Sequence, residues 1–331
     1  MRKKAIALIS GGLDSLLAAR VVMEQGVEVL GVAFIMTAAS SDAEGAARQV
    51  KEISEDAGIP VRMIDISKEF LGVLKDPRHG YGSEMNPCID CKIFMLRKAA
   101  EIMEKEGAGF VVTGEVLGER PMSQNRQSLD LIKRRSGLGG LLLRPLSAKL
   151  LEETDPEKEG LVDREKLLDL KGRGRKKQLA LAEKYNIRSF TAPGASCLLT
   201  DPGFAARIKD LIERDTLSLD EVDLLKYGRH FRLSGGAKAV IGRDEKDNAE
   251  LVSLKKKNDI ILRLERDPGP YGLLRGEARE EDIRRAAALV VSHSRKKNDE
   301  NARVQFWRSK DQVKVITVSP LSRRELEKLR I

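Results

Sequence analysis

The stretch Lys4–Ser15, KAIALISGGLDS, decides the fold of this chain. Its apolar part, Lys4–Ile9, predicts a buried strand, and the apolar spacing of Asp14–Gln25 predicts a helix that follows directly. The two glycines between strand and helix lack a Cβ, so backbone N–H groups there can approach a ligand closely. These N–H groups, the serine hydroxyls and the positive end of the helix converge on one point. The stretch therefore predicts an anion-binding turn.

The rest of the first half alternates between short apolar runs and amphipathic segments. Because strands that alternate with helices form βαβ units, this pattern predicts an α/β domain with a parallel sheet and helices on both of its faces. Ligands bind at the carboxyl ends of such strands, where the glycine turn lies. The expected further strands are Val27–Ile35, Val61–Ile66 and Gly109–Gly114, and the expected helices are Ala43–Ala57, Lys92–Lys105 and Lys176–Tyr185.

The pattern changes after about residue 214. Strands follow one another with few helices between them, which predicts a smaller α+β domain. We therefore expect a catalytic domain over residues 1–214 and a second domain over residues 215–331. The expected strands are Arg229–Leu233, Ala237–Ile241, Asp259–Leu264, Val304–Trp307 and Val313–Val318, and the expected helices are Glu280–His293 and Arg323–Leu329.

Composition excludes several classes of protein. The chain has 331 residues, of which 41% are hydrophobic and 34% are charged, as in a folded protein. It has no apolar run of about 18 residues, and its N-terminal apolar run is too short for a signal peptide, so we expect a cytoplasmic protein without a membrane partner. Three cysteines cannot build a disulfide scaffold, and they point to metal, redox or plain thiol chemistry.

The net charge of +9 is unevenly distributed. Residues 215–331 carry 26 basic and 20 acidic side chains, whereas residues 1–214 carry 34 and 31. This excess favours a polyanionic partner, although a highly charged surface of the thermophile type is an alternative. Aromatic side chains are few, so contacts to backbone phosphates are expected rather than extensive base stacking. The basic candidates are Arg134, Arg135, Arg144, Arg173–Lys177, Lys255–Lys257, Arg284, Arg285, Arg295–Lys297, Arg323 and Arg324.

The turn SGGLDS resembles the PP-loop of the ATP pyrophosphatase superfamily. It lacks the spacing and the lysine of a Walker A loop and the three glycines of a dinucleotide-binding turn. The resemblance implies a PP-loop fold that binds ATP and transfers AMP to a carbonyl or carboxyl oxygen, with Asp14 assisting through Mg²⁺. It also implies that the adenine lies near Phe34, at the end of the second strand. The residues that it assigns to the phosphates are Ser10, Gly11, Gly12, Asp14 and Ser15.

A second motif, NPCIDC over residues 86–91, accompanies a distant third cysteine, Cys197, and the pair Gly114-Glu115. Together these resemble the tRNA thiouridylases over about residues 1–210, first the wobble 2-thiouridine enzymes and next the 4-thiouridine synthetases. Glu115 stands where the wobble enzymes carry histidine. The resemblance implies that a tRNA uridine oxygen attacks the α-phosphate of ATP and that a sulfur nucleophile then displaces AMP. It also makes Gly114 part of the nucleotide site.

The three thiols leave three arrangements open. In one, Cys88, Cys91 and Cys197 hold three irons of a [4Fe–4S] cluster whose open fourth iron binds a sulfide, as in the iron–sulfur tRNA thiolases. In another, Cys197 carries a persulfide that Cys88 attacks, as in the wobble enzymes. The third is a structural zinc with His79 as fourth ligand, or unrelated buried thiols. The sulfur donor is a persulfide carrier or free sulfide. We expect a helix N-terminus to lower the thiol pKa of Cys88 and Cys91.

The C-terminal segments Ser292–Asn298 and Arg303–Phe306 resemble the RNA-binding domain of NFACT ribosome quality-control proteins. The resemblance implies a module that docks tRNA, and a stability or dimerisation module is the alternative. Two other functions compete with tRNA thiolation. One is a PP-loop ligase or a sulfur-transfer enzyme for a substrate other than tRNA. The other is a non-catalytic RNA-binding protein with a relict nucleotide fold.

Overall fold

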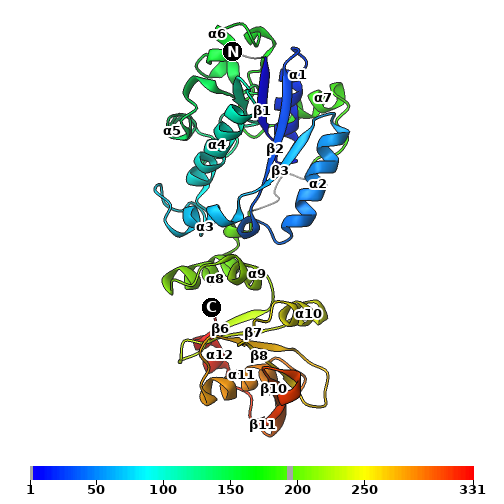
Figure 1. Ribbon diagram of the computed structural model, residues 1–331, viewed down its shortest axis with the longest axis vertical. Helices are drawn as coiled ribbons and strands as arrows, with labels where there is room; N and C mark the ends of the chain where they lie inside the picture. Colours follow the sequence, from blue (N-terminus) through cyan, green and yellow to red (C-terminus); the bar gives the residue numbers. More distant parts are fainter. Residues whose placement is uncertain (1–2, 192–196) are drawn as a thin grey trace. The chain divides into compact units, whose positions relative to one another are not determined.

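The computed structural model describes residues 3–191 and 197–331. The chain forms two compact units, Met1–Asp201 and Pro202–Ile331 (Figure 1). The sequence pattern placed the boundary after residue 214, at the end of helix α8 (Pro202–Glu213). This helix instead packs against α9 (Leu219–Leu225), where the Arg207 guanidinium donates to the Leu225 carbonyl at 2.7 Å. Helix α8 therefore belongs to the second unit.

The first unit is built on a five-stranded parallel sheet in the order β3-β2-β1-β4-β5. Its central strand β1 is covered on both faces, so its two alanines and its isoleucine are all buried. The expected α/β class is confirmed. The strands are β1 (Lys4–Leu8), β2 (Glu28–Ile35), β3 (Val61–Asp65), β4 (Phe110–Val112) and β5 (Leu142–Leu143).

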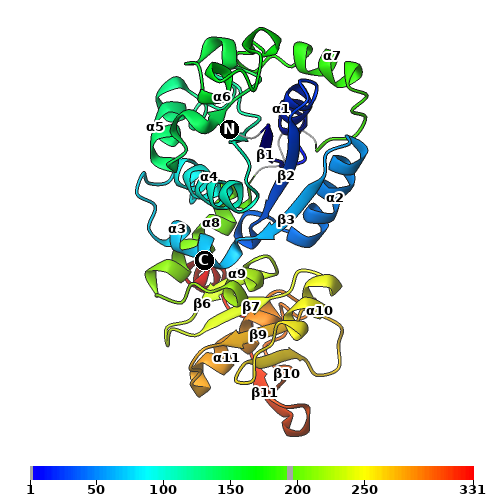
Figure 2. The same ribbon diagram turned by 45° about the horizontal axis from the view of Figure 1, so that its top comes forward.

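Helices cover both faces of this sheet (Figures 1 and 2). One apolar core lies beneath α1, α2 and α7, and a second lies beneath α4 and α5. Helices α3 and α5 and strand β5 were not expected, because their apolar residues are few or interrupted. The helices are α1 (Leu13–Met23), α2 (Ala43–Asp56), α3 (Ser67–Lys75), α4 (Cys88–Lys105), α5 (Arg126–Ser136), α6 (Asp155–Lys158) and α7 (Lys176–Lys184).

The second unit has a six-stranded antiparallel sheet in the order β11-β10-β8-β9-β7-β6. Helix α11 packs on one face, and residues of α9 and α10 pack on the other. The expected α+β class is confirmed, with β9 and α10 added. The elements are β6 (Arg229–Arg232), β7 (Lys238–Ile241), α10 (Glu245–Ser253), β8 (Ile260–Leu264), β9 (Gly272–Arg275), α11 (Glu280–Ser292), β10 (Ala302–Trp307), β11 (Lys314–Val318) and α12 (Arg323–Leu329).

Among the described residues, every helix is too short or too polar to span a bilayer.

Candidate nucleotide and sulfur-transfer site

The SGGLDS turn joins the carboxyl end of β1 to the first turn of α1 and is locked by its own hydrogen bonds. The Ser15 hydroxyl donates to the Gly12 carbonyl at 2.7 Å and accepts from the Ser10 amide at 3.2 Å. Gly11 has a φ of +75°, which an L side chain rarely adopts. The Thr191 amide donates to the Gly11 carbonyl at 2.9 Å. The turn is therefore held from both sides in one conformation.

Gly114, in the loop after β4, lies against the N-terminus of α1. A Cβ at Gly114 would come within 2.5 Å of the Asp14 carbonyl carbon and of the Ser15 amide nitrogen, so only glycine fits. The loop after β4 thus closes on the turn after β1. This contact brings two neighbouring strand ends together, as a nucleotide site at the edge of a parallel sheet requires.

The Asp14 side chain points into a partly buried acidic pair. Its Oδ1 is buried and has no hydrogen-bond partner among the described residues. The carboxyl group lies beside that of Glu119, and burial raises the pKa of both. The neighbouring Glu119 lowers the pKa of Asp14, whereas Asp14 raises the pKa of Glu119 further. Two carboxyl groups that face each other with an unsatisfied oxygen form a donor set that suits Mg²⁺, which binds to one or two carboxylates and to substrate phosphates.

Positive and amide groups surround this acidic pair. Arg175, at the N-terminus of α7, and Arg120 both lower the pKa of Asp14, against the effect of burial. Gln178, one helical turn into α7, is 1% exposed, and its Oε1 has no partner among the described residues. Acidic, guanidinium and amide groups therefore meet at the N-terminus of α1.

Glu119 and Gln178 were not predicted from the sequence, and Arg175 was given another role. The only sequence signal for Glu119 is a carboxylate in the loop that follows strand β4. Arg175 belongs to the basic run Arg173–Lys177, which was considered for RNA contacts. It faces Asp14 because α7 packs beside α1, a long-range relationship that no local pattern predicts.

Phe34 lies near the carboxyl end of β2, half-buried, and packs on the core beneath α4 and α5. Its expected role near the adenine stays a prediction.

A buried ion triad lies next to Gly114. The Glu115 carboxylate accepts from Arg144 Nε at 2.7 Å and from the Lys92 ammonium. Burial alone would raise the pKa of Glu115, but Lys92 and Arg144 outweigh it and lower the pKa to about 2. The expectation that Arg144 is an RNA contact is wrong, because its side chain is 4% exposed and committed to Glu115. Arg134 and Arg135 are exposed on α5.

Cys88 and Cys91 lie in the first turn of α4, as the sequence predicted, and Cys197 lies close to both. Burial, followed by the neighbouring Cys197 and Cys88, raises the pKa of the Cys91 thiol to about 12. Burial also raises the pKa of Cys197. The expectation of a lowered thiol pKa is therefore wrong for Cys91, because desolvation outweighs the helix N-terminus. The fold nevertheless gathers all three cysteines of the chain.

Contacts between segments that are distant in the sequence place Cys197 near the other two cysteines. The Met85 amide, just before the NPCIDC motif, donates to the Leu199 carbonyl at 3.2 Å. The short helix η5 (Leu198–Thr200) also contacts η1 (Thr37–Ala39), which follows β2. Cys91 Sγ lies 3.9 Å from Met36 Sδ. The thiols thus lie beyond the carboxyl end of β2, at the same edge of the sheet as the SGGLDS turn.

His79 is engaged elsewhere. Its Nδ1 lies 2.8 Å from Asp90 Oδ1, and its amide donates to Asp90 Oδ2 at 2.8 Å. In the described part of the chain, no group of three or more His, Cys, Asp or Glu side chains is arranged to hold a metal ion.

Comparison with known proteins fits this geometry. Residues 1–152 match the family model of the thiamine biosynthesis protein ThiI. This match lies within the first unit and includes the SGGLDS turn. Residues 228–330 match the NFACT protein RNA binding domain. Both resemblances inferred from the sequence are thereby confirmed.

Curated relatives match less than half of this chain. A tRNA-specific 2-thiouridylase of Syntrophotalea carbinolica is 30% identical over 34% of this chain and 34% of its own length. A probable tRNA sulfurtransferase of Thermococcus kodakarensis is 30% identical over 43% of this chain and 36% of its own. The chain therefore spans about a third of the length of these relatives. A solved 4-thiouridine synthetase in complex with RNA and ATP is 20% identical and has a TM-score of 0.38. The match covers 67% of this chain and 52% of that chain. This structural similarity is too low to support an inference.

Proposed function

We propose that this chain is an ATP-dependent tRNA sulfurtransferase that adenylates a uridine carbonyl oxygen and then replaces that oxygen by sulfur. The proposal rests on a series of contacts that connects the SGGLDS turn to the three cysteines. Asp14 of the loop packs on Gly114, the adjacent Glu115 pairs with Lys92, and Lys92 follows Cys91. A phosphate-binding turn and a group of three thiols are thereby tied to one edge of one sheet.

In the activation step, the uridine oxygen forms a bond to the α-phosphorus of ATP, and the bond to pyrophosphate breaks. The amides of Gly11 and Gly12 and the hydroxyl groups of Ser10 and Ser15 would hold the phosphates. Asp14 and Glu119 would hold Mg²⁺, which neutralises the charge that develops on the leaving pyrophosphate. The positive charges of Arg120 and Arg175 lie beside the acidic pair and support the same leaving group.

In the second step, a sulfur nucleophile forms a bond to the uridine carbon, and AMP leaves with the original oxygen. We propose that Cys88, Cys91 and Cys197, which lie close together, would hold a [4Fe–4S] cluster, and that this cluster would supply the sulfur. The electrostatics support this choice over a persulfide relay. Each neighbouring thiol raises the pKa of Cys91 further, so removing the thiol protons requires a cation among the three sulfurs. A relay between Cys88 and Cys197 would leave the half-buried Cys91 without a role.

Single serine substitutions separate the two arrangements. The readouts are iron content and visible absorption after anaerobic purification, and 2-thiouridine or 4-thiouridine in tRNA by mass spectrometry of nucleosides. With a cluster, Cys91→Ser abolishes thiolation and bleaches the brown colour, as Cys88→Ser and Cys197→Ser do. A Cys91→Ser variant that still thiolates tRNA, in a colourless protein, would support the relay instead.

The activation step is tested separately. Wild-type protein is incubated with ATP, Mg²⁺ and unmodified tRNA, and pyrophosphate release is measured. Asp14→Ala should abolish the release, whereas Asp56→Ala, which removes an exposed carboxylate at the end of α2, should leave it unchanged. Equal release by wild type and Asp14→Ala would contradict the assignment of the turn.

The second unit would dock the tRNA. Its sequence carries the larger share of the net positive charge, and its match to an RNA-binding domain supports this role.

A further inference from the structure

The second unit contains a groove with a volume of about 950 Å³. Four guanidinium groups line it, those of Arg229, Arg243, Arg263 and Arg295, and we call it the arginine groove. Its walls come from strand β6, the N-terminus of α10, strand β8 and the turn after α11. A concentration of guanidinium groups in one hollow is a feature of sites that bind phosphates, because the planar fork matches the phosphate oxygens.

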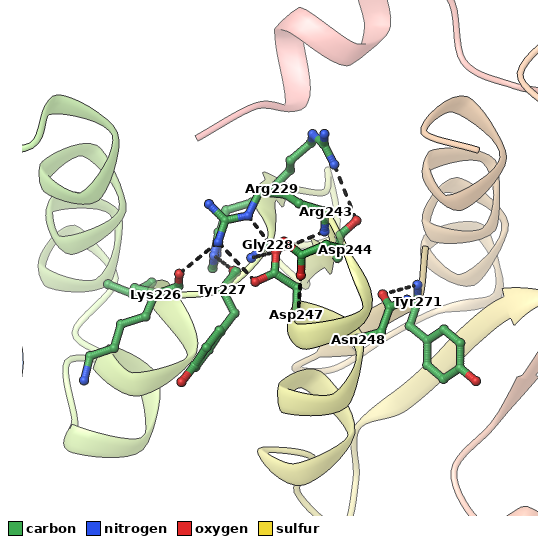
Figure 3. A network of polar contacts seen from close by, with 12 residues as sticks. Lys226, Tyr227, Gly228, Arg229, Arg243, Asp244, Asp247, Asn248 and Tyr271 are labelled. Carbon is green, nitrogen blue, oxygen red and sulfur yellow. Dashed lines mark hydrogen bonds and ion pairs between the residues drawn. The ribbon is translucent and has the colours of Figure 1, made fainter. Parts of the chain in front are cut away.

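One of the four arginines is fixed by the protein itself (Figure 3). Arg243 Nε donates to Asp247 Oδ2 at 2.6 Å, and its terminal nitrogen donates to Oδ1 at 3.1 Å. The buried Asp247 also accepts from the Gly228 amide at 3.1 Å. Asp247 therefore ties α10 to the residue before β6, and the charge of Arg243 is largely neutralised within the fold.

The other three guanidinium groups are not neutralised in this way. Within residues 3–191 and 197–331, Arg229, Arg263 and Arg295 form no ion pair with a carboxylate. Arg229 donates to the Gly242 carbonyl at 3.4 Å, and Arg263 donates to the Tyr271 hydroxyl at 3.0 Å. Arg263 and Arg295 are exposed. Three cations thus face the groove with charge available for an anion.

The opposite wall is firm. Asn248 of α10 accepts from the Tyr271 amide at 2.8 Å and donates to the Gly269 carbonyl at 3.3 Å (Figure 3). These two bonds hold the Pro268–Tyr271 loop against α10. The groove is therefore a preformed feature rather than a gap between mobile loops, which reduces the entropy lost when a ligand binds.

Three acidic side chains also line the groove, and two of them have a bonding partner within the fold. Asp244 caps α10 by accepting from the Asp247 amide at 2.9 Å, and Asp267 lies 3.7 Å from Lys296. Glu245 is exposed and has no ion-pair partner among the described residues. Glu245 is therefore the side chain that would oppose an anion in this groove.

We propose that the arginine groove binds the phosphodiester backbone of RNA, with Arg229, Arg263 and Arg295 as the phosphate contacts and Arg243 as a positioning residue. This inference rests on the proposed function, because it names the surface on which the substrate tRNA docks. The contacts are to phosphates rather than to bases, since both aromatic rings that line the groove are engaged. The Arg263 guanidinium lies 5.8 Å from the centroid of Tyr271, and the His293 ring lies 5.4 Å from that of Phe231.

The test measures binding of a fluorescein-labelled tRNA transcript to the full chain by anisotropy at several salt concentrations. Arg263→Ala and Arg295→Ala should each weaken binding about 10-fold and lower the slope of log affinity against log salt by about one. Arg308→Ala, which removes an exposed arginine just after β10 and outside the groove, is the matched control and should change neither quantity. Equal losses in the control would overturn the assignment.

A change of the opposite sign provides a second arm. Glu245→Gln should tighten tRNA binding about threefold, because it removes a negative charge from the path of the backbone. Weaker or unchanged binding by Glu245→Gln would contradict an anion in this groove. A loss of folding cannot produce a gain in affinity, so this variant keeps the proposal testable if an arginine variant is unstable.

The design separates failure of the groove from failure of the proposed function. If wild-type chain does not bind tRNA, the tRNA sulfurtransferase proposal fails, and the groove proposal fails with it. If wild type binds tRNA and all groove variants match Arg308→Ala, tRNA docks elsewhere, the groove assignment alone fails, and a protein partner becomes the better candidate for the groove.

Discussion

The carboxyl group of Asp14 lies beside the carboxyl group of Glu119, although the two residues are far apart in the sequence. Burial raises the pKa of both, so the pair is unfavourable in its fully ionised form at neutral pH. Arg120 and Arg175 offset part of this cost. Such a pair is stabilised by a divalent cation, and this relationship adds Glu119 to the loop that the sequence identified.

Glu119→Gln should reduce Mg²⁺-dependent pyrophosphate release about 100-fold, because it removes one of the two carboxylates beside the developing charge. The same change should raise the melting temperature of the metal-free protein by about 2–4 °C, since the repulsion by Asp14 that raises the pKa of Glu119 is removed. Differential scanning fluorimetry without Mg²⁺ measures the second effect. Release at the wild-type rate would remove Glu119 from the site.

Gly114→Ala should disrupt the nucleotide turn. The added Cβ would lie 2.5 Å from backbone atoms of Asp14 and Ser15, so either the loop after β4 or the start of α1 must move. ATP affinity, measured by isothermal titration, should fall at least about 10-fold. Gly72→Ala is the control, because a Cβ there meets no atom within 4 Å. If both variants bind ATP equally well, the close contact between Gly114 and α1 does not affect ATP binding.

Glu115→Gln should destabilise the first unit by about 3 kcal/mol, because it leaves Lys92 and Arg144 without their shared carboxylate. The pKa of Glu115, about 2, also predicts a pH dependence. Its contribution is complete above the unfolded pKa of about 4.3 and is lost as the pH falls toward 2. Urea unfolding followed by circular dichroism between pH 7 and pH 3 measures both effects.

The control for this experiment is Glu55→Gln, which removes one partner of an exposed pair with Lys51 at 3.9 Å. An exposed pair of this kind contributes about 0–1 kcal/mol. If Glu115→Gln costs no more than this control, the triad is not a structural link between β4 and α4.

Lys238→Met should stabilise the second unit. Lys238 is 2% exposed, and its ammonium nitrogen has no hydrogen-bond partner among the described residues. Burial lowers its pKa to about 7. Between about pH 7 and pH 10.4 the unfolded chain therefore binds a proton that the folded chain does not, so the free energy of unfolding should rise with pH in this window.

The substitution should flatten this pH dependence and raise the free energy of unfolding at pH 7 by about 2 kcal/mol. The chain has a single tryptophan, Trp307, which packs in the core of the second unit, so its fluorescence reports this unit alone. Lys257→Met, at an exposed lysine, should leave the profile unchanged. A wild-type profile that is flat from pH 7 to pH 10 would show that Lys238 is solvated.

The sequence by itself determined the glycine turn between β1 and α1, the α/β class of the first unit and the α+β class of the second. These features are local: glycines between a strand and a helix, apolar periodicity, and the change of period after about residue 214. Strand β9 and helix α10 were missed because the first is short and the second carries few apolar residues.

Only the tertiary structure decided which distant side chains meet. It placed Arg175 beside Asp14 rather than on an RNA surface, buried Arg144 in an ion triad, and raised the Cys91 pKa that local helix geometry would have lowered. Burial and charge pairing depend on neighbours from other elements. A pattern along the chain specifies which residue types are present, whereas the dielectric environment of each one is fixed by the packing of helices and strands around it.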